Sequence, residues 1–295
     1  MNLTAQLPLI WAAILGVAVM LYVILDGFEL GMGMLFPFAR DDGERDRMLA
    51  SIAPYWDGNQ TWLVLGGGGL LVAFPRAYAI VMPAFYLPLI VMLLALMFRG
   101  VTFYFRAISH HKHLWNVVFA AASTLVGLCQ GVVLGGLVQG IRVENGAFAG
   151  GPFDWATPFG LMCALGVAAG YALLGATWLI LKTDGDIAQR AAAKAKALLV
   201  MVLVFMAAVS IFTPLTLPRI RAAFVKCEAS RDGMIRGKSH TMLNDGDIDQ
   251  QRHIRGAVGA IVAAVLNDTA LFVSGGAEHQ GPNGGGFIAV IAEKG

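Results

Sequence analysis

Long apolar stretches are the feature that most limits what this chain can fold into. Of its 295 residues, 57% are hydrophobic and 14% are charged, and its mean hydropathy is +0.68. A soluble domain usually carries about 25% charged residues. Inside a bilayer the backbone polar groups must be satisfied within the chain, so apolar runs of about 20 residues predict transmembrane helices. We therefore predict an all-α, polytopic transmembrane helix bundle.

Six stretches are apolar enough to be predicted as spans. They cover about residues 7–36, 62–76, 78–98, 115–139, 158–181 and 197–217. The first run has no basic segment before it and continues too far for a cleaved signal peptide, so we expect it to remain in the mature protein. The second run is short and can begin earlier, inside the polar segment before it. The net charge of +2 gives no indication of a nucleic-acid partner.

Lysine and arginine residues are unevenly distributed among the loops, which predicts the orientation. Residues 1–39 contain none, whereas the loops 40–55, 99–114 and 182–196 are basic. The loop 140–157 contains a single arginine. The simplest topology places the N-terminus outside and the three basic loops in the cytoplasm.

Glycines at every fourth position predict close helix contacts, because small residues let helix backbones approach each other in lipid. Gly127, Gly131 and Gly135 form one such ridge, and Gly166 and Gly170 form another. The run of four glycines at residues 66–69 lacks the Lys-Ser/Thr of a phosphate loop. We interpret it as a packing seam or a loosened helix.

Two acids interrupt the first apolar run, in the segment DGFELGMG at residues 26–33. Asp26 and Glu29 are three residues apart, so on a helix they lie about 60° from each other. An acid at membrane depth is costly and is functional by default. Two interpretations stay open: a proton relay or polar site between helices, or acids that already lie at the cytoplasmic boundary. Gly27 and Gly31 predict that another helix comes close.

A second polar motif, WDGNQTW at residues 56–62, stands directly before an apolar run. Asn59 and Gln60 can hydrogen-bond the carboxylate of Asp57, and the two indoles suit an interfacial belt. Asp57 can instead be a simple N-cap, although a cap needs only one polar side chain. Arg99, at the end of the third predicted span, can pair with Asp57 or Glu29, or extend to the membrane surface.

The histidines argue against a haem held by this chain alone. A buried haem most often has a His axial ligand, but no histidine lies within a predicted span; they are His110, His111, His113, His240, His253 and His279. The cluster HHKH at residues 110–113 is better explained as part of a basic loop than as a metal site. Cys129, Cys163 and Cys227 have no metal-ligand spacing and predict no disulfide framework. We therefore predict no metal site.

The C-terminal part of the chain reads differently from the rest. Residues 226–295 carry 15 of the 40 charged residues (21 Lys and Arg plus 19 Asp and Glu). The weakly apolar segment 256–273 is interrupted by Asn267 and Asp268. We divide the chain into a transmembrane domain, residues 1–224, and a polar tail, residues 225–295. The tail is either a genuine extramembrane appendage or a sequence that has lost its reading frame.

Four segments together resemble subunit II of the cytochrome bd quinol oxidases, and more narrowly the cyanide-insensitive branch. They are DGFELGMG at 26–33, SIAPYWDGNQTW at 51–62, LMFRGVTFYFR at 96–106 and PFGLMCALG at 158–166. The resemblance covers about residues 1–224. Two or three more hydrophobic spans follow in that family, and the polar tail departs from this pattern.

The resemblance implies a subunit of a terminal respiratory oxidase in the bacterial inner membrane, with a periplasmic N-terminus. The complex of that family oxidises ubiquinol and reduces oxygen to water. Its haem b and haem d are ligated mainly by subunit I, so this chain would pair with subunit I as a heterodimer and carry no directly catalytic residue.

The resemblance also suggests roles for individual residues. The expected proton path from the cytoplasm consists of Asp57, Asp26, Glu29, Asn59 and Gln60. Trp62 matches a position associated with oxygen access, and Arg99 matches a basic residue of the third helix.

Two other functions are compatible with the residues. Intramembrane acids and glycine-rich helices also suit an ion-coupled secondary transporter, although the chain shows no inverted repeat. A purely structural membrane subunit is the other alternative, with the polar motifs serving only helix packing.

Overall fold

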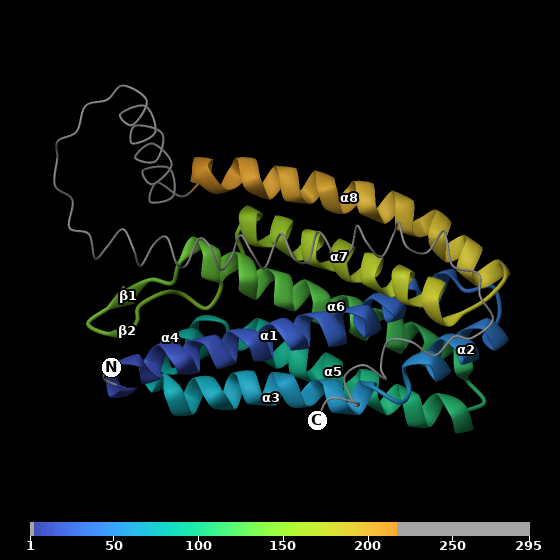
Figure 1. Ribbon diagram of the computed structural model, residues 1–295, viewed down its shortest axis with the longest axis horizontal. Coiled ribbons are helices and arrows are strands. Elements are labelled where there is room, and N and C mark those ends of the chain that lie inside the picture. The colour runs from blue at the N-terminus through green and yellow to red at the C-terminus, as the bar shows by residue number, and fades with distance from the viewer. Residues whose placement is uncertain (1–2, 217–295) are drawn as a thin grey trace. The chain divides into compact units, whose positions relative to one another are not determined.

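The described part of the protein, residues 3–216 of a computed structural model, is a bundle of helices (Figure 1). Its elements, in chain order, are α1 Leu3–Leu35, the 3₁₀ turn η1 Phe36–Phe38, α2 Asp42–Ile52, α3 Trp56–Ala73, α4 Pro75–Ala84, α5 Tyr86–Ile108, α6 Lys112–Gln139, β1 Val143–Glu144, β2 Ala147–Phe148, α7 Pro158–Lys182 and α8 Asp186–Thr216. The predicted all-α fold is confirmed. The tail, residues 225–295, lies outside the described residues.

Five helices within the described residues are long and apolar enough to cross a membrane. They cover Gln6–Phe38, Tyr86–Ile108, Lys112–Gln139, Pro158–Lys182 and Asp186–Leu215. The predicted number of six is therefore not reached. The predicted span 62–76 falls in α3, which begins at Trp56 with the polar motif and also carries the glycine run. Because of these residues, α3 is less apolar over its 18 residues than the most apolar stretches of the five spanning helices, and it is not among them.

The third predicted span, 78–98, was misplaced. It straddles α4 and α5, because the backbone leaves the helical conformation at Phe74 (φ −136°, ψ 62°) and again at Phe85 (φ −120°, ψ 21°). Phe74 precedes Pro75, and a residue before proline is biased away from the helical region. The spanning helix is α5. It ends at Ile108, about ten residues beyond the predicted end at residue 98.

Helix α7 lies at the centre of the packing and contacts α1, α6 and α8. Gly31 of α1 and Gly175 of α7 face each other so closely that a Cβ on either would collide with the backbone of the other helix. This confirms the close approach predicted at Gly31. Gly131 and Gly135 of α6 meet α7 in the same way, at Ala164 and Gly160. The predicted ridge on α6 is thus confirmed.

The second predicted pair of glycines does not mediate such a contact. A Cβ on Gly170 would meet no atom within 4 Å, and one on Gly166 would make an ordinary 3.4 Å contact with Phe205. The glycine run of α3 is a regular helix; Gly69 touches the Leu15 side chain, while Gly67 and Gly68 face open space. It is a partial packing seam against α1.

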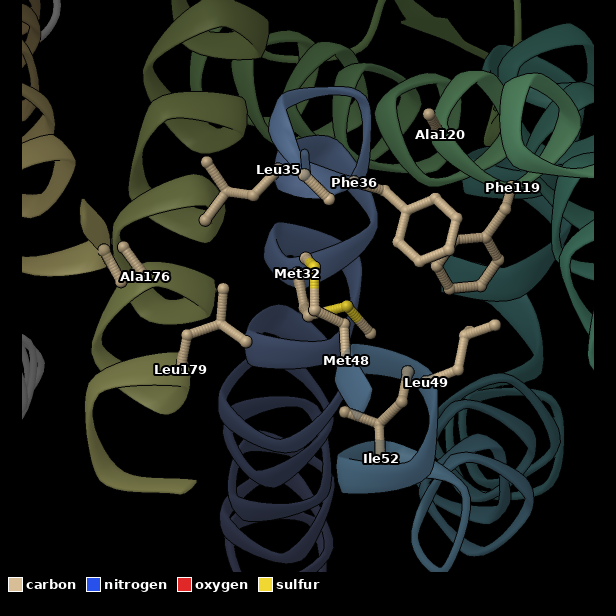
Figure 2. Close-up of a cluster of buried hydrophobic side chains, with 12 residues drawn as sticks. Met32, Leu35, Phe36, Met48, Leu49, Ile52, Phe119, Ala120, Ala176 and Leu179 are labelled. Carbon is tan, nitrogen blue, oxygen red and sulfur yellow. The ribbon is translucent and has the colours of Figure 1, made fainter. Parts of the chain in front are cut away.

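One end of the bundle is closed by α2, an 11-residue helix within the predicted loop 40–55. Asp41 caps it by accepting a hydrogen bond from the backbone N–H of Glu44 at 2.7 Å. Its apolar side chains join a buried cluster with α1, α6 and α7 (Figure 2), which contains Met32, Phe36, Met48, Ile52, Phe119 and Leu179. The helix is too short and too charged to show a clear hydrophobic period, which is why the sequence did not predict it.

Ion pairs fasten α2 to its neighbours at this end. Arg190 of α8 pairs with Glu44 at 2.7 Å, and Arg106 of α5 pairs with Asp46. Asn116 of α6 donates a hydrogen bond to Asp42 at 3.1 Å, and this bond lowers the pKa of the Asp42 carboxyl below its ordinary value. The α2 end therefore joins the three basic loops of the sequence into one polar surface.

The outward faces of the long helices are apolar. The most apolar window of α8 has no buried residue, and Val64 and Val72 of α3 are more than 70% exposed. Soluble proteins rarely expose such continuous apolar surface. The exterior of this bundle suits lipid or another apolar chain.

Candidate functional site

A cluster of charged side chains lies in the interior of the bundle, where α1 meets α5. Arg99 donates a hydrogen bond from Nη2 to Oε2 of Glu29 at 2.8 Å, and its Nη1 lies 3.4 Å from Oδ1 of Asp26. All three side chains are at most 1% exposed. The two acids are therefore buried between helices rather than exposed on the bundle surface. Of the partners predicted for Arg99, Glu29 is the one the structure provides.

Asn59 of α3 completes the cluster. Its Nδ2 donates to Oε1 of Glu29 at 2.6 Å and lies 3.3 Å from the carbonyl oxygen of Leu25. Both oxygens of Glu29 therefore have a donor. Asp26 is less well satisfied, because its Oδ2 atom is buried without a hydrogen-bond partner among the described residues.

The charges of this cluster do not balance when every group is ionised. Arginine stays protonated in proteins, so two carboxylates beside it leave one excess negative charge. An uncompensated charge in a water-free interior is strongly disfavoured. The cluster becomes neutral when it binds one proton. This charge balance makes the cluster a candidate site for binding a proton.

Aromatic rings of α3, α5 and α6 form a connected group beside the cluster. The guanidinium of Arg99 lies 5.8 Å from the ring centre of Phe119, a distance at which the ring face attracts a cation. Phe119 packs edge-on against Phe103, which stacks on Trp56 at 5.0 Å. The first indole of the WDGNQTW motif is thus anchored against α5, beside Gly100.

The motif divides between two sides of α3. Asp57 and Asn59 are two residues apart, so they point about 200° away from each other on a helix. Asn59 is buried against Glu29, whereas Asp57 is exposed and has no hydrogen bond or ion pair within the described residues. The predicted bond from Asn59 to Asp57 is wrong for this reason, and the structure shows no bond from Gln60 to Asp57 within the described residues, although both lie on the same side of α3.

The predicted N-cap role of Asp57 is also wrong. Helix α3 begins at Trp56 with Tyr55 as its N-cap residue, and no side chain caps it. Asp57 lies in the first turn, where its charge favours the positive end of the helix. Gln60 and Trp62 are half-buried on the following turns, and neither side chain has a hydrogen-bond partner in the part of the chain that the structure describes.

Two polar groups were missed by the sequence interpretation. Arg106 and Asn116, both buried, join α5 and α6 to Asp42 and Asp46 at the α2 end. A second group, Tyr22, Gln130 and Tyr171, joins α1, α6 and α7 in the bundle interior. A glutamine within the predicted span 115–139 was the available signal for the second group.

The residues of the described bundle do not fit a haem held by histidine. His110, His111 and His113 lie at the junction of α5 and α6, outside the interior of the spans. Within residues 3–216 no group of three His, Cys, Asp or Glu side chains could hold a metal ion. Cys129 and Cys163 are free and buried; the other cysteine and the other three histidines lie outside the described residues.

Comparison with known proteins identifies the family. Residues 7–292 match the family described as cytochrome bd terminal oxidase subunit II. The chain belongs to this family. Relatives include cytochrome bd-I ubiquinol oxidase subunit 2 of Escherichia coli strain K12, which is 36% identical over 208 residues, 67% of this chain and 55% of the relative. Cytochrome bd ubiquinol oxidase subunit 2 of Bacillus subtilis is 30% identical over 68% of this chain and 61% of its own length.

The chain thus spans little more than half the length of the cytochrome bd relatives it matches. The same bundle occurs in the structure of bd oxidase from Geobacillus thermodenitrificans, with a TM-score of 0.54 at 18% identity over 72% of this chain and 65% of that chain. This likeness shows that the helical fold of the described bundle also occurs in a bd oxidase.

A shorter stretch of the chain matches an unrelated protein. It is 57% identical over 74 residues to cyanuric acid amidohydrolase of Pseudomonas sp. strain ADP, and 53% identical over 76 residues to that of Enterobacter cloacae. The match covers about a quarter of this chain and 20% of either amidohydrolase.

Proposed function

We propose that this chain is the subunit II of a quinol:oxygen oxidoreductase and that its buried charged cluster forms the inner part of a proton path. The family membership supports the first statement. The observation that carries the second is the Asp26, Glu29 and Arg99 cluster, which is buried in the interior of the bundle and would become neutral by binding one proton. The proposed substrate is ubiquinol, and the narrower cyanide-insensitive branch remains a prediction.

The proposed path begins at the α2 end of the bundle. Asp57 is exposed at the start of α3, where it can exchange protons with water. Gln60 lies one turn later on the same side and would extend this entrance. Asn59 holds Glu29 from the other side of the helix. Protons would pass from the entrance to Glu29 and then, past the fixed charge of Arg99, to Asp26.

Arg99 is the positioning residue of this mechanism. Its guanidinium touches both carboxyl groups, so it lowers the cost of holding either one ionised. Because the cation cannot lose its own proton, it keeps the cluster at a charge that favours one bound proton. The haems b and d, which we propose are held mainly by subunit I, supply the electron transfer and the oxygen chemistry. For Trp62, half-buried on α3, the role in oxygen access stays a proposal from the resemblance.

We propose that the α2 end faces the cytoplasm and the N-terminus faces the periplasm of a bacterial inner membrane. The three basic loops of the sequence meet at this end, around Arg106, Arg190 and α2. Basic loops favour the cytoplasmic side. The proton entrance at Asp57 would then open to the cytoplasm.

We also propose that the stretch matched by the amidohydrolases is the polar tail, residues 225–295. Its 71 residues are close in number to the 74–76 residues of the match, and its polar composition differs from that of the bundle. On this proposal the tail would be a joined coding segment rather than a lost reading frame, within a chain whose family match runs from residue 7 to residue 292. Sequencing across codons 218–230 tests this, because a single-base correction that restores apolar spans would point to a frameshift instead. The match covers a fifth of an amidohydrolase, and we propose no such activity.

Purification tests the assignment as an oxidase subunit. The chain, tagged and expressed in a host with the matching subunit I, should bring down a heterodimer partner with haem absorption and quinol-dependent oxygen uptake. A colourless protein that purifies alone would support the transporter alternative.

Single substitutions test the proton path within that complex. Asp57→Asn and Glu29→Gln should lower quinol-dependent oxygen uptake at unchanged haem content. Glu144→Gln, which neutralises an exposed acid of the β1–β2 hairpin, is the matched control. Undiminished uptake in both test variants would remove the proton-path role, whereas loss of haem would indicate a role in assembly.

A further inference from the structure

A second hydrogen-bonded group lies next to the charged cluster. Gln130 of α6 donates from Nε2 to the hydroxyl oxygen of Tyr22 on α1 at 2.8 Å. The hydroxyl of Tyr171 on α7 donates to Oε1 of the same glutamine. Both tyrosines are at most 5% exposed. Three helices thus contribute polar side chains to one buried site.

The directions of these bonds leave one hydrogen unassigned. The amide nitrogen of Gln130 can only donate, so the Tyr22 oxygen acts as acceptor there. The hydroxyl hydrogen of Tyr22 remains available to another acceptor. Tyr22 lies four residues before Asp26, and side chains at this spacing are neighbours on a helix.

The acceptor for this hydrogen is present. Oδ2 of Asp26 is buried and has no hydrogen-bond partner among the described residues, and the Tyr22 side chain interacts with this carboxyl group. Glu29, in contrast, has donors on both oxygens, at 2.8 and 2.6 Å. Of the two acids, Asp26 is therefore the one with an oxygen free to accept a further hydrogen bond among the described residues.

We propose that Tyr22 is a positioning residue that donates its hydroxyl hydrogen to Asp26 whenever this carboxyl has released its proton, and that Gln130 and Tyr171 hold it in that orientation. This inference rests on the proposed proton path and assigns three residues to it. From Glu29 to Tyr22 the helix rises about 10 Å. The polar line along α1 thus covers about two turns in all, about one turn more than the acids alone indicate.

Proton binding by Asp26 depends on the charged and titratable groups around it in the described bundle. They are Tyr22 and Glu29 on α1, Arg99 on α5 and Tyr171 on α7, with Asn59 of α3 acting through Glu29. A hydrogen bond donated to a carboxylate favours its ionised form. Removing the Tyr22 donor should therefore make Asp26 retain its proton up to a higher pH.

The test uses the assembled oxidase with the variant Tyr22→Phe, which removes one oxygen atom and keeps the ring. The acid limb of the pH profile of quinol-dependent oxygen uptake should move to higher pH by about one unit. Gln130→Met should move it in the same direction by a smaller amount. Tyr86→Phe, at the exposed start of α5, is the matched control and should not move it.

Infrared difference spectroscopy of the same complexes supplies a readout besides activity. The band of the protonated carboxyl that disappears in Asp26→Asn should change frequency in Tyr22→Phe and stay unchanged in Tyr86→Phe. An unmoved pH limb together with an unmoved band in Tyr22→Phe overturns the inference. If Glu29→Gln and Asp57→Asn slow oxygen uptake in the same preparation, the proton path itself survives that result.

Discussion

Replacing Arg99 with methionine should destabilise the protein more than any other single substitution in the bundle interior. The side chain is fully buried and makes ion pairs with Asp26 and Glu29. Methionine has a similar length and no charge, so the variant leaves two carboxyl groups in the membrane interior without their cation.

The magnitude follows from the geometry of this cluster. Removing one partner of a buried ion pair costs about 3–5 kcal/mol, because the other charge stays buried and uncompensated. Here one cation serves two acids, so we expect a loss within or above that range. For a domain of 150–250 residues, 1 kcal/mol corresponds to about 2–4 °C in the midpoint of thermal unfolding. We therefore expect the midpoint to fall by roughly 6–20 °C.

The assay measures the thermal midpoint of the purified complex in mild detergent. Unfolding is monitored as the fraction of the complex that remains monodisperse after heating. The triple variant Arg99→Met, Asp26→Asn, Glu29→Gln is the essential comparison, because it removes the unbalanced charges as well. It should recover most of the lost stability and retain only the cost of unmade hydrogen bonds, about 1–3 kcal/mol. A single variant that melts within about 2 °C of the wild type, or a triple variant that melts below the single one, would refute the charge argument.

Further predictions concern packing, pH and the aromatic anchor. Gly31→Ala should strongly lower the thermal midpoint because the new Cβ would collide with the backbone of α7 at Tyr171, while Gly170→Ala should be neutral, since its Cβ would meet nothing within 4 Å; equal midpoints would contradict the α1–α7 contact. The lowered pKa of Asp42 contributes stability above the unfolded value of about 3.9, and this is lost as the pH falls through the lower folded value. The variant Asp42→Asn should therefore show a smaller loss of midpoint than the wild type between pH 5 and pH 3, and a parallel loss in both proteins would exclude this contribution. Trp56→Ala should remove the stacking on Phe103 and lower the midpoint further than Trp155→Ala, whose half-buried indole bonds the Pro152 carbonyl and contacts Phe153 within its own loop; the reverse order would contradict the anchoring of α3.

The sequence predicted the features that depend on neighbouring residues. The all-α bundle followed from the apolar runs, and the shared face of Asp26 and Glu29 followed from their spacing of three. Arg99 had two possible acidic partners and a solvent-directed alternative, and the choice of Glu29 depends on how α1 and α5 cross. The place of α1 in the bundle depends on long-range contacts such as Gly31 with Gly175 of α7, and the sequence does not specify these pairings.

The errors have physical reasons of the same kind. Asn59 was expected to bind Asp57, but a helix that already starts at Trp56 turns the two side chains to opposite sides. Helix α2 is stabilised by Asp41, by the ion pairs of Glu44 and Asp46 and by a cluster shared with α1, α6, α7 and α8, rather than by its own periodicity. The Tyr22, Gln130 and Tyr171 group joins residues more than a hundred positions apart, so its members could not be recognised as partners from the sequence.

The most direct measurement of the central proposal is proton uptake by the oxidase complex in lipid vesicles. A pH-sensitive dye on the side of the α2 end should report rapid proton uptake after oxygen is added to the quinol-reduced enzyme. In the Glu29→Gln complex, at equal haem content, this uptake should slow by roughly tenfold or more, and in Glu144→Gln it should keep the wild-type rate. Wild-type uptake in the Glu29→Gln complex, or uptake from the opposite side of the membrane, would contradict the proposal.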